Sequence, residues 1–112
     1  MRNWTVLAVG DVVADCGVSM IAKFLPRLRR QYETDFVVVN GENASVVGIT
    51  QQQAEEILDA GADVITMGNH TYAKREIVPY MEDSSRILRP ANYAPQAPGR
   101  GYGIYESKCG PV

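Results

Sequence analysis

The chain has 112 residues, of which 46% are hydrophobic and 21% are charged, a composition typical of a globular domain rather than of a disordered or fibrous chain. Eleven basic residues against thirteen acidic ones give a formal net charge of -2, so the charge balance indicates neither a DNA partner nor an anionic membrane partner. A chain of this length closes one hydrophobic core, which excludes a two-domain enzyme within these residues.

The start of the chain and its cysteines both bear on the cellular compartment. The segment MRNWTVLAVGD holds an apolar run that is too short for the core of a secretory signal and far too short to span a bilayer. Cys16 and Cys109 lie far apart, without the CxxC or Cys/His spacing of a zinc site, and are interpreted as two reduced thiols. We therefore expect a cytoplasmic protein.

Three apolar runs share one format. They are residues 4–9 (WTVLAV), 35–39 (DFVVV) and 63–67 (DVITM), and each ends at a glycine beside a polar residue. Runs of about five apolar and β-branched residues without polar alternation predict strands that are buried on both faces, as in a parallel sheet.

Helical periodicity follows the first run. Its apolar positions are Met20, Ile21, Phe24, Leu25 and Leu28. Ser19 is the expected N-cap of this helix, and Pro26 predicts a kink. Arg27, Arg29 and Arg30 stand near its C-terminal end, where basic side chains favour the helix dipole.

The rest of the chain predicts two more helices and a long loop. Thr50 and Gln53 form a capping-box pattern, and Gly61 stands where that second helix should end. A weaker pattern, interrupted by Pro79, predicts a third helix over about residues 73–82. Residues 94–103 are rich in Pro and Gly and predict a loop, and residues 102–107 predict a short strand.

The order βαβαβα predicts an α/β fold, with a parallel sheet, right-handed crossovers and flanking helices. One local signal favours another topology. Asn40-Gly41 stands between two apolar runs and is the strongest short-range signal of a β-hairpin. Against the hairpin, the second run lacks clean alternation and is soon followed by Thr50, which opens a helix.

Polar side chains follow each predicted strand. Asp11 comes after the first, Glu42 and Asn43 after the second, and Asn69 and His70 after the third. Ligands of open α/β sheets bind outside the carboxyl ends of the strands, so these residues should converge. Carboxylate, amide and imidazole groups together suit Mg²⁺, Mn²⁺, Fe²⁺ or Zn²⁺.

Each of these residues also has a purely structural interpretation. A Gly-Asp pair after a strand is commonly a turn with a helix-capping carboxylate, which would account for Asp11 alone. A single histidine such as His70 is more often an exposed or hydrogen-bonded residue than a catalyst. The joint pattern therefore carries the functional interpretation.

Several ordered motifs resemble the YmdB-like family of metallophosphoesterases. They are GDVV at 10–13, NGEN at 40–43, GIT at 48–50, DVITMGNHTY at 63–72, RPANY at 89–93 and PGRGYG at 98–103. The similarity covers almost the entire chain. GNH after a strand is shared more widely, across the calcineurin-like phosphoesterase superfamily.

The resemblance implies a two-metal phosphodiesterase that acts on small cyclic nucleotides, of which 2′,3′-cyclic AMP and GMP are the usual substrates in this family. It implies that Asp11 binds one divalent metal ion, that Glu42 bridges the pair, and that Asn43 and Asn69 complete the ligands available in this chain. It also implies that His70 protonates the leaving oxygen or holds the phosphate. The identity of the metals, Mn, Fe, Mg or Zn, stays open.

The chain also departs from the family it resembles. Ala14 stands where the family usually has glycine, Val18 where it has a basic residue, and the loop between Ala44 and Gly48 is one residue shorter. Family members are more than twice as long, and their second half supplies three metal-binding histidines, whereas this chain has one histidine.

We therefore expect residues 1–112 to form the N-terminal portion of one metallophosphoesterase domain, half of its α/β sandwich. Four protein ligands do not fill two metal shells without water. The chain alone should accordingly bind metal weakly and turn over slowly or not at all. An unpaired sheet edge should also promote association between copies.

Arg100 is a further candidate for contact with a phosphate or substrate, because a guanidinium on a loop can close over an anion; the competing interpretation is a solvated charge. The alternative to an enzyme is a noncatalytic α/β module that binds a nucleotide or a protein through the same rim. The chain lacks GxGxxG and GxxxxGK[ST], so dinucleotide and P-loop binding are not indicated. A receiver domain would need an aspartate where Asn69 stands.

Overall fold

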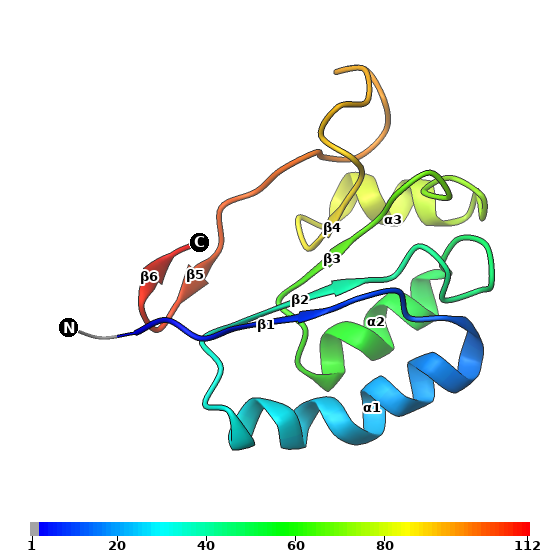
Figure 1. The fold of residues 1–112 in the computed structure, drawn as a ribbon. Coiled ribbons are helices and arrows are strands. Elements are labelled where there is room, and N and C mark those ends of the chain that lie inside the picture. The colour runs from blue at the N-terminus through cyan, green and yellow to red at the C-terminus, as the bar shows by residue number, and fades with distance from the viewer. Residues whose placement is uncertain (1–2) are drawn as a thin grey trace.

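A four-stranded parallel sheet forms the centre of the computed structural model, which describes residues 3–112 (Figure 1). Its strands are β1 (Val6–Val9), β2 (Phe36–Asn40), β3 (Val64–Thr66) and β4 (Ile87–Leu88), in that spatial order. The connecting helices are α1 (Ala14–Gln31), α2 (Gln51–Ala60) and α3 (Ile77–Asp83). A small antiparallel hairpin, β5 (Glu106–Ser107) and β6 (Gly110–Pro111), follows.

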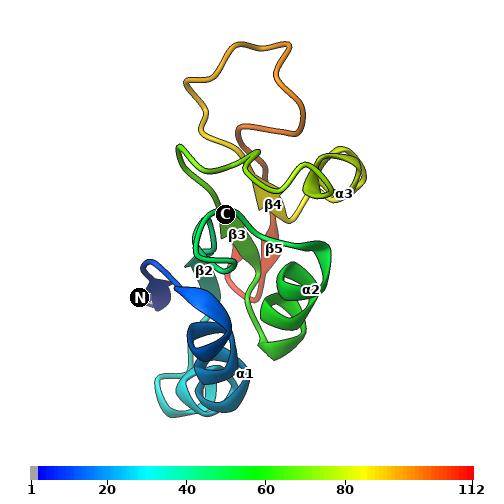
Figure 2. The same ribbon diagram turned by 90° about the vertical axis from the view of Figure 1, so that its right-hand side faces the viewer.

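The three helices cover one face of this sheet (Figure 2). On that face Val37, Val39 and Ile65 are completely buried and form the centre of the core. The opposite face carries no helix, and Val6 on β1 is 51% exposed. Near the amino end of β2 it is partly covered by Tyr105, whose ring lies 5.8 Å from that of Phe36.

The predicted α/β topology is confirmed. All neighbouring strands of the sheet run parallel, with Val9 opposite Val39 and Val39 opposite Ile65. The alternative hairpin at Asn40-Gly41 is wrong, because β2 pairs with β1 and β3 and no strand follows it directly. The Gly41 amide instead donates to the carbonyl of Thr66 on β3.

The second helix has the predicted ends. The Thr50 hydroxyl accepts from the backbone N–H of Gln53 over 3.1 Å, and the Gln53 side chain accepts from the Thr50 N–H over 3.0 Å. Gly61 ends the helix with a φ of 127°, a region that favours glycine.

Other element boundaries differ from the predictions. α1 begins at Ala14, so Ser19 is an interior residue and not the N-cap; the capping residue is Val13, in extended conformation without a side-chain cap. α3 begins at Ile77, which places Pro79 in its first turn, where a missing N–H costs little. The sequence did not predict β4, and the strand expected over 102–107 is limited to β5.

Within residues 3–112, no helix is both long and apolar enough to cross a bilayer. The C-terminus and the β5–β6 hairpin lie near the amino ends of the strands, on the left in Figure 1. The opposite edge, formed by the carboxyl ends of the strands, carries the loops that hold the polar residues singled out above.

Candidate functional site

The loops after β1, β2 and β3 meet at the carboxyl edge of the sheet. The N–H of Val12 donates to the carbonyl of Asn40 over 3.1 Å, and the N–H of Ala14 donates to the carbonyl of Asn43 over 3.0 Å. Val13 and Asn43 form an isolated parallel bridge. The first loop is therefore fastened to the second by backbone hydrogen bonds.

Asp11, Asn43 and His70 form a hydrogen-bonded chain across this edge. Asn43 Nδ2 donates to Asp11 Oδ1 over 2.7 Å, and Asn43 Oδ1 lies 2.8 Å from His70 Nδ1. An ionised carboxylate only accepts, so the Asn43 nitrogen faces Asp11 and its oxygen faces His70. His70 Nδ1 must then carry a proton, which leaves Nε2 as the nitrogen available for chemistry.

Glu42 contacts the turn that carries His70. Its Oε2 accepts from the His70 backbone N–H over 3.3 Å and lies 3.7 Å from His70 Nδ1. Its Oε1 lies 3.5 Å from Asn40 Nδ2. A Cβ on Gly68 would lie 2.2 Å from Glu42 Oε1, so this carboxylate occupies the space that glycine leaves open.

The turn from Gly68 to Thr71 is held by hydrogen bonds to the Gly68 carbonyl. The Gly68 carbonyl accepts from the Thr71 N–H over 3.1 Å and from the Thr71 hydroxyl, and Thr71 is fully buried. The Tyr93 hydroxyl donates to the same carbonyl over 3.0 Å. The sequence patterns did not predict that Thr71 and Tyr93 support this turn, although both residues lie in motifs that carry the family resemblance.

The loop between β2 and α2 is held by its own backbone and by one side chain. Gly48 N–H donates to Glu42 O over 2.6 Å, and Ser45 N–H donates to Gly48 O over 2.8 Å. Gln53, from the capping box, also accepts from the Ser45 hydroxyl over 2.6 Å and donates to the Ala44 carbonyl over 3.1 Å.

Three residues around this site have strained backbone, and a fourth, Glu33, lies after the far end of α1. Asp11, Ala14 and Val46 have positive φ values of 33°, 61° and 67°. Side chains rarely adopt this region, and for a β-branched residue such as Val46 it is a genuine outlier. At Ala14 the strain matches the expectation that relatives have glycine at this position.

The structure does not bring every predicted residue into the hydrogen-bonded group. Asn69 lies on the same turn as His70 and is exposed to solvent. The Arg100 guanidinium donates to the Ser84 carbonyl over 3.1 Å. Ser84 precedes β4, so this guanidinium is directed toward the amino end of the strand and away from His70.

The donors at the carboxyl edge are chemically suited to a divalent cation. Asp11 and Glu42 supply carboxylate oxygens, Asn43 and Asn69 supply amide oxygens, and His70 is an adjacent imidazole. Among residues 3–112, no group of three or more His, Cys, Asp or Glu side chains is placed to hold a metal ion. These residues thus fit part of a coordination shell, with the remaining positions left to other donors.

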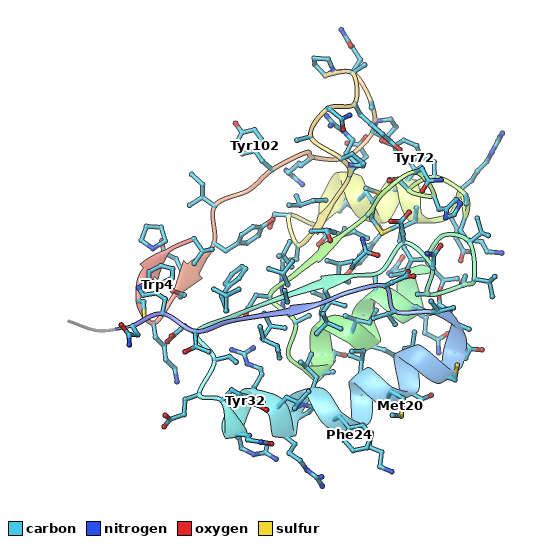
Figure 3. All side chains as sticks on the ribbon, in the orientation of Figure 1. Trp4, Met20, Phe24, Tyr32, Tyr72 and Tyr102 are labelled. Atoms are coloured by element: carbon cyan, nitrogen blue, oxygen red, sulfur yellow. The ribbon has the colours of Figure 1, made fainter. Side chains whose placement is uncertain are left out.

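A cavity of about 610 Å³ lies elsewhere. It is lined by Arg29 in the last turn of α1 and by residues at the amino ends of β1 and β2, including Thr5, Thr34 and Asp35. The polar residues of the carboxyl edge do not line it. The loops that follow β1, β2 and β3 lie on the right side of Figure 1 and of Figure 3.

Comparison with known proteins identifies the family of the chain. The family model described as YmdB-like protein matches residues 7–111. A Bacillus subtilis (strain 168) protein named 2′,3′-cyclic-nucleotide 2′-phosphodiesterase is 40% identical over 97 residues, which cover 86% of this chain and 37% of that protein.

Two solved structures share the fold with a TM-score of 0.82 each. One is a hypothetical protein from Thermus thermophilus, 33% identical, and the match covers 95% of this chain and 41% of the other. The second is described as a novel phosphatase from Mycoplasma pneumoniae, 28% identical, with 95% and 40% covered. The chain thus spans about two fifths of the length of these relatives, and it belongs to the YmdB-like family.

Proposed function

We propose that this chain carries part of the active site of a hydrolase, a metal-dependent phosphodiesterase that acts on small cyclic nucleotides of the 2′,3′-cyclic AMP and GMP class. The observation that supports this most directly is the convergence of three loops, which joins Asp11, Asn43 and His70 by hydrogen bonds of 2.7 and 2.8 Å and places Glu42 beside them. The name of the Bacillus subtilis relative supports the substrate class.

The proposed metal ligands are Asp11, Glu42, Asn43 and Asn69. Asn43 Oδ1 has two lone pairs, so it can accept from His70 and still offer one to a cation. The family resemblance implies that Glu42 is the ligand shared by the two metal ions, and its position on the loop after β2, in contact with His70 on the loop after β3, is consistent with that role. Divalent cations held by these residues would supply an activated water and would neutralise charge on the phosphoryl oxygens.

His70 has the proposed role of a proton donor to the leaving oxygen. The Asn43 amide occupies Nδ1, so proton transfer falls to Nε2. The Glu42 carboxylate lies 3.7 Å from Nδ1, on the same side of the ring as the Asn43 amide. Asp11 orients the Asn43 amide, and the Asn43 amide orients the His70 ring.

Metal binding tests the site directly. Titration of the 112-residue chain with Mn²⁺, followed by calorimetry, should show weak binding. Asp11→Asn and Glu42→Gln should each weaken that binding at least about tenfold, because each removes a charged oxygen ligand. Asp59→Asn, an exposed residue on α2, serves as the control. Binding that survives both site substitutions would contradict the proposed ligands.

A turnover assay tests the reaction. With Mn²⁺ present, we expect 2′,3′-cyclic AMP to be hydrolysed well below ordinary enzyme rates of about 1–1000 per second, because the coordination shell in this chain is partial. His70→Asn should abolish the remaining turnover. Hydrolysis at ordinary enzyme rates by the unmodified chain would overturn the expectation of a partial site. Nucleotide binding that is unchanged when a chelator removes the metal would favour a noncatalytic binding module.

We also propose a cytoplasmic location. It is supported by the sequence, which has two cysteines in 112 residues and lacks the dense cysteine spacing of a secreted disulfide framework.

A further inference from the structure

Residues 89–101, here called the strap, lie against the turn that carries His70. The Tyr93 hydroxyl donates to the Gly68 carbonyl over 3.0 Å, and the Tyr72 hydroxyl donates to the Pro98 carbonyl over 2.6 Å. The rings of Tyr72 and Tyr93 are 6.0 Å apart. The strap is the yellow to orange segment that arches beyond β4 in Figure 2, and Tyr72 is labelled beside it in Figure 3.

Arg89 closes the strap into a fixed loop. Its side chain is buried, with 7% of the residue exposed. Nε donates to Ala97 O over 3.3 Å, Nη1 donates to Pro90 O over 3.0 Å, and the backbone N–H donates to Arg100 O over 2.9 Å. A Cβ on Gly101 would lie 2.8 Å from Nη1. The guanidinium thus joins both arms of the strap through their carbonyl groups.

The Gly68 carbonyl is the point at which the strap meets the site. It accepts from Tyr93 and from both the N–H and the hydroxyl of Thr71. The orientation of this carbonyl sets the plane of the peptide bond between Gly68 and Asn69. The backbone of Asn69 and His70 continues from that peptide, and the His70 N–H then reaches Glu42.

We propose that Tyr93 is a positioning residue for His70, acting from the strap through the Gly68 carbonyl. The functional importance of the His70 position rests on the proposed function, whereas the contact between Tyr93 and Gly68 does not depend on that proposal. Thr71 holds the turn from within, and Tyr93 holds the same carbonyl from a segment more than 20 residues away. Burial raises the pKa of Tyr72, which keeps its own hydroxyl protonated and able to donate to the Pro98 carbonyl.

The test uses the single histidine of the chain as a probe. His70 is the only histidine in the sequence, so its ring signals in an NMR spectrum are assigned without ambiguity. Tyr93→Phe keeps the ring against Tyr72 and removes only the hydroxyl. We expect shifted His70 ring signals and about fivefold faster hydrogen exchange of the Thr71 amide, the factor that corresponds to loss of a hydrogen bond worth about 1 kcal/mol.

Two further variants make the outcome decisive. Tyr102→Phe, at a position that is 79% exposed, should leave both signals unchanged. Tyr93→Leu removes the ring as well, so it separates ring packing from the hydroxyl contact. His70 signals that are native in Tyr93→Phe but altered in Tyr93→Leu would overturn the proposal. The measurement is made without metal or nucleotide, so its failure is distinct from failure of the proposed function.

Discussion

Asn43 lies between Asp11 and His70, with its amide oxygen 2.8 Å from Nδ1 of the imidazole. The Asp11 carboxylate accepts a hydrogen bond of 2.7 Å from the Asn43 amide nitrogen. This bond fixes the orientation of the amide and, through the amide, the tautomer of His70. An asparagine that the sequence offered only as a metal ligand thus also orients the proposed acid.

Asn43→Ala should remove the preference of the neutral His70 ring for the tautomer that is protonated at Nδ1. Without the acceptor at Nδ1, the neutral ring exchanges between its two N–H forms, and the ¹⁵N chemical shifts of the two ring nitrogens move toward each other. A two-bond ¹H–¹⁵N correlation spectrum measures this at neutral to alkaline pH. Asn92→Ala, on the exposed strap, is the control. Unchanged ring shifts in Asn43→Ala would show that the amide does not set the tautomer.

Gly68→Ala should impair metal binding more than folding. The new Cβ would lie 2.2 Å from Glu42 Oε1, and this flexible side chain would move aside at low cost in stability. We expect the free energy of unfolding to change by less than about 1 kcal/mol, while Mn²⁺ affinity falls about tenfold or more. Gly10→Ala is the matched control, because a Cβ there meets nothing within 4 Å. Equal affinity in both variants would contradict the contact.

Stability should fall in alkaline solution. Burial raises the pKa of Tyr72, Tyr80 and Tyr105 above the ordinary value of 10.0. The folded state therefore binds more protons than the unfolded state, so these residues contribute stability that is fully present below about pH 10 and is lost as pH rises through the folded pKa values. Urea unfolding from about pH 9 to about pH 11.5 measures the slope.

A substitution locates the alkaline effect. Tyr105→Phe should make the loss of stability above about pH 10 shallower, since burial raises the pKa of the Tyr105 hydroxyl and phenylalanine has no group to titrate. Tyr102→Phe, at an exposed position, should leave the pH dependence as it is. An unfolding free energy that rises in this alkaline range would reverse the sign expected here.

Val46→Asn should stabilise the chain. Val46 has a φ of 67° and is 63% exposed, so the substitution relieves backbone strain and loses little buried surface. A gain of about 1 kcal/mol is expected, because asparagine tolerates the left-handed region at lower cost. Thermal unfolding should show a rise of about 4–8 °C. Val47→Asn is the neighbouring control, and an equal gain there would remove strain as the explanation.

Copies of the chain should associate through the β1 edge of the sheet. β1 pairs only with β2, and Val6 on it is 51% exposed. Size-exclusion chromatography should therefore show a concentration-dependent elution volume, and Val6→Lys should restore monomers by placing a charge on the edge strand. Met20→Lys, on the exposed side of α1, is the control (Figure 3). A compact monomer at every concentration would count against this prediction.

The sequence predicted those parts of the fold that rest on local patterns. The apolar runs specified β1, β2 and β3, and the Thr50–Gln53 pair specified the start of α2. The start of α1 could not be predicted in this way, since Val13 caps it through extended backbone rather than through a side chain. β4 has two residues, too few to produce a periodic pattern.

For the candidate site, the positions were predictable and the contacts were not. The rule that ligands bind at the carboxyl ends of parallel strands indicated Asp11, Glu42 and His70. The order of the hydrogen bonds through Asn43 depends on side chains about 30 residues apart, which no local pattern encodes. The direction of Arg100 likewise depends on the Ser84 carbonyl.

Gln53 makes two properties of the molecule inseparable. Its side-chain amide completes the cap of α2 and also accepts a hydrogen bond from the Ser45 hydroxyl. The same amide donates to the Ala44 carbonyl and, over 3.3 Å, to Asp15 on α1. Any substitution at this position would fray the beginning of a helix and loosen the loop beside the rim in a single event. The start of α2 and the order of the loop before it therefore depend on the same side chain, so a substitution of Gln53 changes both at once.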